Sequence, residues 1–163
     1  EIHQYEIENK TGNKVVDTIL ASKNALCKKF KISFNYVVDG SLLDFMDVMD
    51  ICSILGNALD NAIECEQKIE GDEKRLIYMA VFSQKNFVIL RFENYFEGEL
   101  IIQEGTPVTT KKKEAGYHGY GIKSIQHVVN KYGGAVSFGK VDNWFELKIL
   151  IPREMNMEET EKL

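Results

Sequence analysis

The sequence lacks the features that define several protein classes. No apolar run approaches the roughly 18 residues that a membrane-spanning helix needs, and no signal peptide is visible. The three cysteines are widely spaced and form no C-x-x-C pair, which argues against a disulfide framework or a zinc site and favours reduced thiols in the cytosol. An excess of positive charge is also missing: the net charge is −5, so nucleic acid is not an expected partner.

Proline is scarce, and the long run from Asp44 to Ile69 contains none. The chain of 163 residues is 44% hydrophobic and 28% charged, which is enough to bury the core of one domain. We expect that domain to span residues 11–152. Residues 1–10 are expected to be the end of a preceding segment, and the acidic residues 153–163 a disordered tail.

The run from Asp44 to Ile69 is predicted to form one amphipathic helix, because apolar residues recur in it at three- and four-residue steps. Asn57, Asn61 and Glu64 share a neighbouring stripe of this helix. Such a cluster of oxygens suits Mg²⁺, although a solvated polar face is an equally good interpretation of this segment alone. Cys52 and Cys65 are expected to pack in the core. The apolar stripe consists of Ile51, Leu55, Ala58, Ala62, Cys65 and Ile69.

The order of the predicted elements indicates an α+β fold, a two-layer α/β sandwich. Its mixed, mostly antiparallel sheet should have about five strands, with about three helices on one face. The segment from Asn94 to Thr109 is weakly periodic and is predicted to be a loop. Besides the central helix, the predicted elements are helices from Val15 to Phe30 and from Ile122 to Lys131, and strands Ile32–Val38, Leu76–Phe82, Phe87–Phe92, Ala135–Val141 and Trp144–Ile151.

A glycine-rich stretch, Gly116 to Gly121, precedes the last predicted helix. Gly119 and Gly121 can adopt positive φ and can let backbone N–H groups approach a ligand closely, and the helix N-terminus makes this an anion site suited to phosphate. The stretch matches neither a Rossmann nor a Walker pattern. A simple turn before a helix is the more frequent explanation of such glycines.

Taken together, these motifs resemble the ATP-binding catalytic domain of the GHKL (Bergerat-fold) superfamily, which includes gyrase, Hsp90, histidine kinases and MutL. The stretch Leu55–Glu64 resembles the N-box, and His118–Ile125 resembles the second glycine box. Thr109-Thr110-Lys111 is similar to the threonine-lysine stretch before that box. The resemblance runs from about Gly12 to Ile151 and is greatest to sensor histidine kinases of the Agr/VirS quorum-sensing type.

This resemblance implies a protein-histidine kinase of a two-component system. The domain would transfer the γ-phosphate of ATP to a histidine on a dimerisation domain outside this chain, with a response regulator acting downstream. Residues 1–10 would then end a linker or dimerisation helix. The chain would be a monomeric, cytoplasmic fragment of a dimeric, membrane-anchored bacterial kinase, without membrane contact of its own.

Roles for individual residues follow from the same resemblance. Asn61 matches the asparagine that coordinates Mg²⁺ between the nucleotide phosphates. Asn57 stands where ATP-hydrolysing relatives have a catalytic glutamate, and a carboxamide cannot take a proton from water. We therefore expect slow hydrolysis. The implied nucleotide contacts are Asn57, Asn61, Asn94, Gly98, Thr110, Lys111, His118, Gly119, Tyr120, Gly121 and Ile122.

The first glycine box departs from the family pattern D-x-G-x-G. If Phe92 is the last inward residue of its strand, Asn94 replaces the aspartate and Phe96 the first glycine, while Gly98 is retained. An asparagine can still accept a hydrogen bond from the adenine amino group. Alternatively, Asn94 only starts a turn.

The surroundings of His3 do not resemble a phospho-acceptor motif, so the chain is expected to lack its own phosphorylation site. Two other functions are compatible with the motifs. One is an anti-sigma-type protein-serine kinase, which would require an anti-anti-sigma partner. The other is a non-catalytic nucleotide-binding or interaction module in which the altered glycine box has lost ATP.

Overall fold

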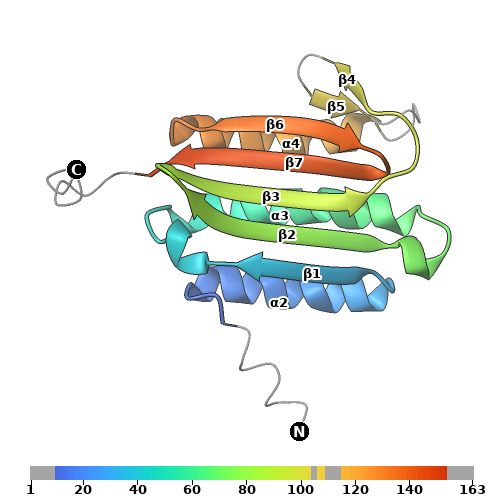
Figure 1. The fold of residues 1–163 in the computed structure, drawn as a ribbon, viewed down its shortest axis with the longest axis horizontal. Coiled ribbons are helices and arrows are strands. Elements are labelled where there is room, and N and C mark those ends of the chain that lie inside the picture. Colours follow the sequence, from blue (N-terminus) through green and yellow to red (C-terminus); the bar gives the residue numbers. More distant parts are fainter. Residues whose placement is uncertain (1–9, 104–105, 109–114, 154–163) are drawn as a thin grey trace, which may run out of the picture.

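The computed structural model describes residues 10–103, 106–108 and 115–153. Helices and strands are named as in Figure 1. They are α2 (Lys14–Lys29), β1 (Ser33–Val38), η1 (Gly40–Leu43), α3 (Val48–Gln67), η2 (Asp72–Lys74), β2 (Leu76–Gln84), β3 (Phe87–Tyr95), β4 (Ile101–Gln103), β5 (Thr106–Val108), α4 (Ala115–Lys131), β6 (Ala135–Val141) and β7 (Trp144–Pro152).

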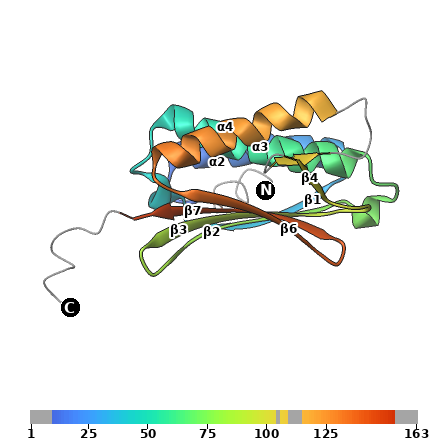
Figure 2. The ribbon, with the colours of Figure 1, turned by 90° about the horizontal axis from the view of Figure 1, so that it is seen from above.

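The described chain forms a two-layer sandwich. Its main sheet has five strands in the order β1-β2-β3-β7-β6, in which β1 and β2 are parallel and the other neighbours antiparallel. Helices α2, α3 and α4 lie together on one face of this sheet, as Figure 2 shows. The predicted fold class is therefore confirmed. None of the described helices has the length and apolar character needed to cross a membrane.

Both predicted hairpins are present, joined by Lys85-Asn86 and Asp142-Asn143. Lys85 and Asp142 have φ values of 54° and 52°, which fits the left-handed turn geometry that matches the twist of paired strands. At the start of α2, the side-chain oxygen of Asn13 accepts hydrogen bonds from the first backbone N–H groups of the helix. These local signals explain why the sequence pattern predicted the elements well.

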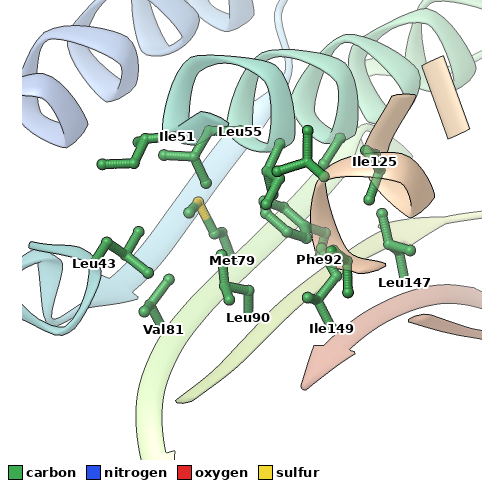
Figure 3. Close-up of a cluster of buried hydrophobic side chains, with 14 of the residues drawn as sticks. Leu43, Ile51, Leu55, Met79, Val81, Leu90, Phe92, Ile125, Leu147 and Ile149 are labelled. Atoms are coloured by element: carbon green, nitrogen blue, oxygen red, sulfur yellow. The ribbon is translucent and has the colours of Figure 1, made fainter. Parts of the chain in front are cut away.

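The core lies between the helices and the inner face of the sheet (Figure 3). Alternate residues of the central strands point toward the helices, and the register places Met79 opposite Phe92, and Phe92 opposite Leu147. The central helix α3 covers them with its apolar stripe. The core side chains labelled in Figure 3 are Leu43, Ile51, Leu55, Met79, Val81, Leu90, Phe92, Ile125, Leu147 and Ile149.

Three expectations about local structure are wrong. The segment predicted as a loop contains the last residues of β3 and the short antiparallel pair β4-β5, because three-residue strands are too brief to show a two-residue alternation. The glycine stretch lies within α4, where packing against α3 outweighs the weak helix propensity of glycine. Cys52 is exposed rather than packed in the core, whereas Cys65 is partly buried.

Candidate functional site

The central helix α3 presents two asparagines toward α4. Asp47 caps the N-terminus of α3 by accepting a hydrogen bond from the backbone N–H of Met49. The apolar stripe of α3 then faces the sheet. Asn57 and Asn61, one turn apart, are left half-buried at the side of the helix.

Gly121 of α4 is the residue that meets these asparagines. A Cβ atom added to Gly121 would lie 3.4 Å from Oδ1 of Asn57 and 3.7 Å from Oδ1 of Asn61. Gly121 is helical and its φ is not positive, so it does not use the left-handed conformation that glycine allows. Its lack of a side chain therefore serves a close approach between two helices, and it brings the predicted second glycine box against the predicted N-box.

The carboxamide of Asn57 is oriented by its own helix. Its Nδ2 donates to the backbone oxygen of Ser53 at 2.7 Å, which leaves Oδ1 directed toward Gly121. Both asparagines therefore present oxygens to a neighbouring helix. A metal site and a partly solvated polar face both stay compatible with a stripe that lies against α4.

Hydrogen bonds at the far end of the two helices hold α3 and α4 together. Nζ of Lys131 and the hydroxyl of Tyr132 both donate to Oδ2 of Asp50, at 2.8 and 2.5 Å. The Tyr132 hydroxyl also accepts from the backbone N–H of Asp47 at 3.0 Å. The hydrogen bond from Lys131, followed by that from Tyr132, lowers the pKa of Asp50. The ion pair thus fixes the helix that carries Gly121 relative to the helix that carries the asparagines.

Asn94 lies within β3 and does not start a turn. It pairs with Ile77 on β2 and Phe145 on β7, and only 4% of its surface is exposed. Its Nδ2 donates to the backbone oxygen of Tyr95 at 3.1 Å. Asn94, and not Phe92 as expected, is therefore the last inward residue of the strand.

The rest of the predicted first glycine box follows directly after β3. Phe96 donates its backbone N–H to the oxygen of Asn143 at 2.8 Å, and its ring lies 6.2 Å from that of Phe145. The aromatic side chain at this position therefore packs against the sheet. Gly98 has a φ of 111°, a conformation that favours glycine, and its oxygen accepts a hydrogen bond from Nζ of Lys140.

Glu66 is a buried group that we did not predict. Its side chain is fully buried beside Asn94, and neither carboxyl oxygen has a hydrogen-bond partner. Burial raises the pKa of Glu66 to about 8, and the neighbouring Asn94 side chain opposes this shift. A sequence signal was present, because Glu66 follows Ala62 and Ile63 at the spacing of the buried stripe.

The other predicted nucleotide contacts lie in α4 or just before it in the sequence. Ile122 is 2% exposed and belongs to the core. The backbone of His118, Gly119 and Tyr120 belongs to the first turns of α4. Two further predicted contacts, Thr110 and Lys111, lie outside the described residues.

The donor set suits a metal that takes few protein ligands. Among the described residues, no group of three or more His, Cys, Asp or Glu side chains comes together to hold an ion. Asn57 and Asn61 offer neutral oxygens on one side of a helix. Mg²⁺ accepts such a site, because it usually keeps several waters and is bound mainly through substrate phosphates.

A five-stranded mixed sheet covered by three helices, with paired asparagines facing a glycine of the last helix, defines the class of domain that the motifs resemble. The sequence profile of the GHKL domain matches residues 46–152, which is more than half of the chain. The chain therefore belongs to the GHKL family. A search among curated protein sequences gave no match.

Solved structures of the same fold include histidine kinases. The nucleotide-free catalytic domain of histidine kinase ThkA is 20% identical, with a TM-score of 0.65 over 88% of this chain and 93% of that chain. The Acinetobacter baumannii histidine kinase AdeS is 14% identical, with a TM-score of 0.58 over 86% of this chain and 64% of that chain. At these identities the likeness establishes the fold.

Proposed function

We propose that residues 11–152 are the ATP-binding catalytic domain of a sensor histidine kinase that passes the γ-phosphate of ATP to a histidine on a dimerisation domain. The observation that carries this proposal is the approach of Gly121 to Asn57 and Asn61, which joins the two family motifs in one place. The folds of ThkA and AdeS support it, because both proteins are histidine kinases.

Each asparagine has a distinct role in this proposal. The Oδ1 atom of Asn61 would hold Mg²⁺, whose charge offsets that of the phosphates. Asn57 would contact the phosphate region without acting as a base, because a carboxamide cannot accept a proton from water. The domain would therefore hold ATP for transfer and hydrolyse it slowly.

The wider context is part of the same proposal. The N-box and second glycine box support assignment to the Agr/VirS quorum-sensing type. The kinase would act in the cytoplasm on a response regulator, with residues 1–10 leading from its dimerisation segment and residues 153–163 as a tail. The proposed nucleotide contacts beyond the asparagines are Gly98, Thr110, Lys111, His118, Gly119, Tyr120, Gly121 and Ile122.

We expect Asn94→Ala to weaken the binding of ATP and ADP by the same factor, because Asn94 would contact the base and not a phosphate. Loss of one neutral hydrogen bond corresponds to a decrease of roughly three- to tenfold. Titration calorimetry with each nucleotide measures the effect. Unchanged affinity for both nucleotides would place the base elsewhere.

We expect Gly121→Ala to stabilise the fold and weaken ATP binding. Alanine in place of glycine within a helix is worth up to about 1 kcal/mol, and the added Cβ meets the Asn57 oxygen only at van der Waals distance. The same methyl group occupies the space that separates α4 from the asparagines. Denaturant unfolding should therefore show a higher free energy of unfolding, and ATP titration should show a lower affinity. An equal or higher ATP affinity would contradict the assigned site.

Titration calorimetry of the chain with ATP, with and without Mg²⁺, tests the proposed function most simply. Saturable binding that is stronger with Mg²⁺ is expected. Absence of ATP binding under both conditions would contradict the proposal and leave only the fold.

A further inference from the structure

Glu66 and Asn94 are the two buried polar side chains in the described part of the chain, and they lie side by side. Glu66 is 0% exposed, and both of its oxygens lack a hydrogen-bond partner. Leaving a carboxyl group in this state is costly, since a buried group without a partner loses its hydration without compensation. A role in the neighbouring site would account for its presence.

The Asn94 carboxamide lies among three electron-rich groups, which are the Tyr95 oxygen, the Cys65 thiol and the Glu66 carboxyl. Its Nδ2 donates to the Tyr95 oxygen at 3.1 Å. The Asn94 side chain also lowers the pKa values of the Cys65 thiol and the Glu66 carboxyl, so it lies beside both groups, although neither Glu66 oxygen has a hydrogen-bond partner. Oδ1 is the acceptor atom on the other side of the same carboxamide.

The orientation of this carboxamide decides which base it can recognise. With Nδ2 turned inward, Oδ1 is free to accept a hydrogen bond from an amino group. In the flipped orientation, Nδ2 would instead donate to a carbonyl group. The first orientation suits a purine with an amino group at position 6, and the second a purine with a carbonyl there.

We infer that Glu66 is a positioning residue that holds Asn94 with its oxygen toward the nucleobase and so makes the site select a 6-aminopurine. This inference rests on the proposed function, because it requires a nucleotide at Asn94. When a base is bound, the Glu66 carboxyl accepts the second N–H of Asn94, beside the hydrogen bond to Tyr95. A carboxyl group keeps an acceptor oxygen in either protonation state, so the role does not depend on ionisation.

Two variants of the full chain test this role. Glu66→Gln is nearly isosteric, but its amide can donate to Oδ1 of Asn94 and stabilise the flipped orientation. Glu66→Met removes the acceptor and places an apolar side chain of similar size where the carboxyl had no partner, so its fold should be retained. Glu70→Gln makes the same chemical change at an exposed position and is the matched control.

The measurement is the ratio of affinities for ATP and inosine triphosphate, which carries a carbonyl in place of the 6-amino group. The unmodified chain and Glu70→Gln should prefer ATP, and both Glu66 variants should lose roughly three- to tenfold of this preference. The inference would be overturned if folded Glu66→Met keeps the full preference for ATP, or if it binds ATP and inosine triphosphate more weakly by the same factor. The proposed function would still stand in that case, because the unmodified chain binds ATP. Failure of the unmodified chain to bind either nucleotide would overturn both.

Discussion

Replacing Asn61 with alanine should decrease phosphate transfer to an added histidine-bearing dimerisation segment by roughly a hundredfold or more, the scale on which enzymes lose rate when one charge-stabilising contact is removed. Asn61 supplies one of the oxygens that face Gly121, and we propose that this oxygen holds Mg²⁺ against the phosphates. The side chain is only half-buried, so its truncation should leave the fold intact. Initial transfer rates at saturating ATP and Mg²⁺ measure the effect.

Asn130→Ala is the matched control for this experiment. Asn130 is also a helical asparagine, but it is exposed near the end of α4, away from Gly121. Its replacement should leave the transfer rate unchanged. If Asn61→Ala transfers phosphate as fast as Asn130→Ala does, Asn61 does not bind the metal.

The free energy of unfolding should fall as the pH rises from about 4.5 to about 8, owing to Glu66. Burial raises the pKa of Glu66 from its ordinary value of 4.5 to about 8, with Glu97 adding to the shift and Asn94, Tyr95 and Arg75 opposing it. Between these values the folded state keeps a proton that the unfolded state has released. Each pH unit therefore favours unfolding by up to about 1.4 kcal/mol.

The contribution of Glu66 to the pH dependence of stability is obtained by comparing the unmodified chain with Glu66→Gln, whose side chain cannot ionise. Below about pH 4.5 the carboxyl is protonated in both states, and above about pH 8 it is ionised in both, so the difference between the two proteins should be constant outside this window. Urea unfolding at several pH values provides the data. Parallel stability curves across the window would show that Glu66 ionises normally in the folded chain.

Local sequence signals predicted most of the fold because each had a direct physical cause. The three- and four-residue spacing of apolar residues located α3, and alternation with short polar turns located both hairpins of the main sheet. The same spacing showed that Asn57 and Asn61 share one stripe of this helix, where carboxamides are unusual, whereas their role stays a prediction.

Features that depend on contacts between distant segments could not be predicted. The sequence predicts a loop at Gly121, whereas the residue lies in α4 and closely approaches Asn57 of α3. The packing of Phe96 against Phe145 likewise joins segments that are far apart in the sequence. Glu66 stands at the spacing of the buried stripe of α3, but its burial beside Asn94 also depends on where β3 ends relative to α3.

The most direct test of the central claim is incubation of the chain with γ-³²P-labelled ATP and Mg²⁺, with and without the dimerisation segment that carries the acceptor histidine. Transfer requires that imidazole in line with the γ-phosphate at close range. We predict no label on the chain alone, slow release of phosphate, and acid-labile label on the added segment. Stable label on His3, rapid phosphate release, or an unlabelled segment despite bound ATP would contradict the account.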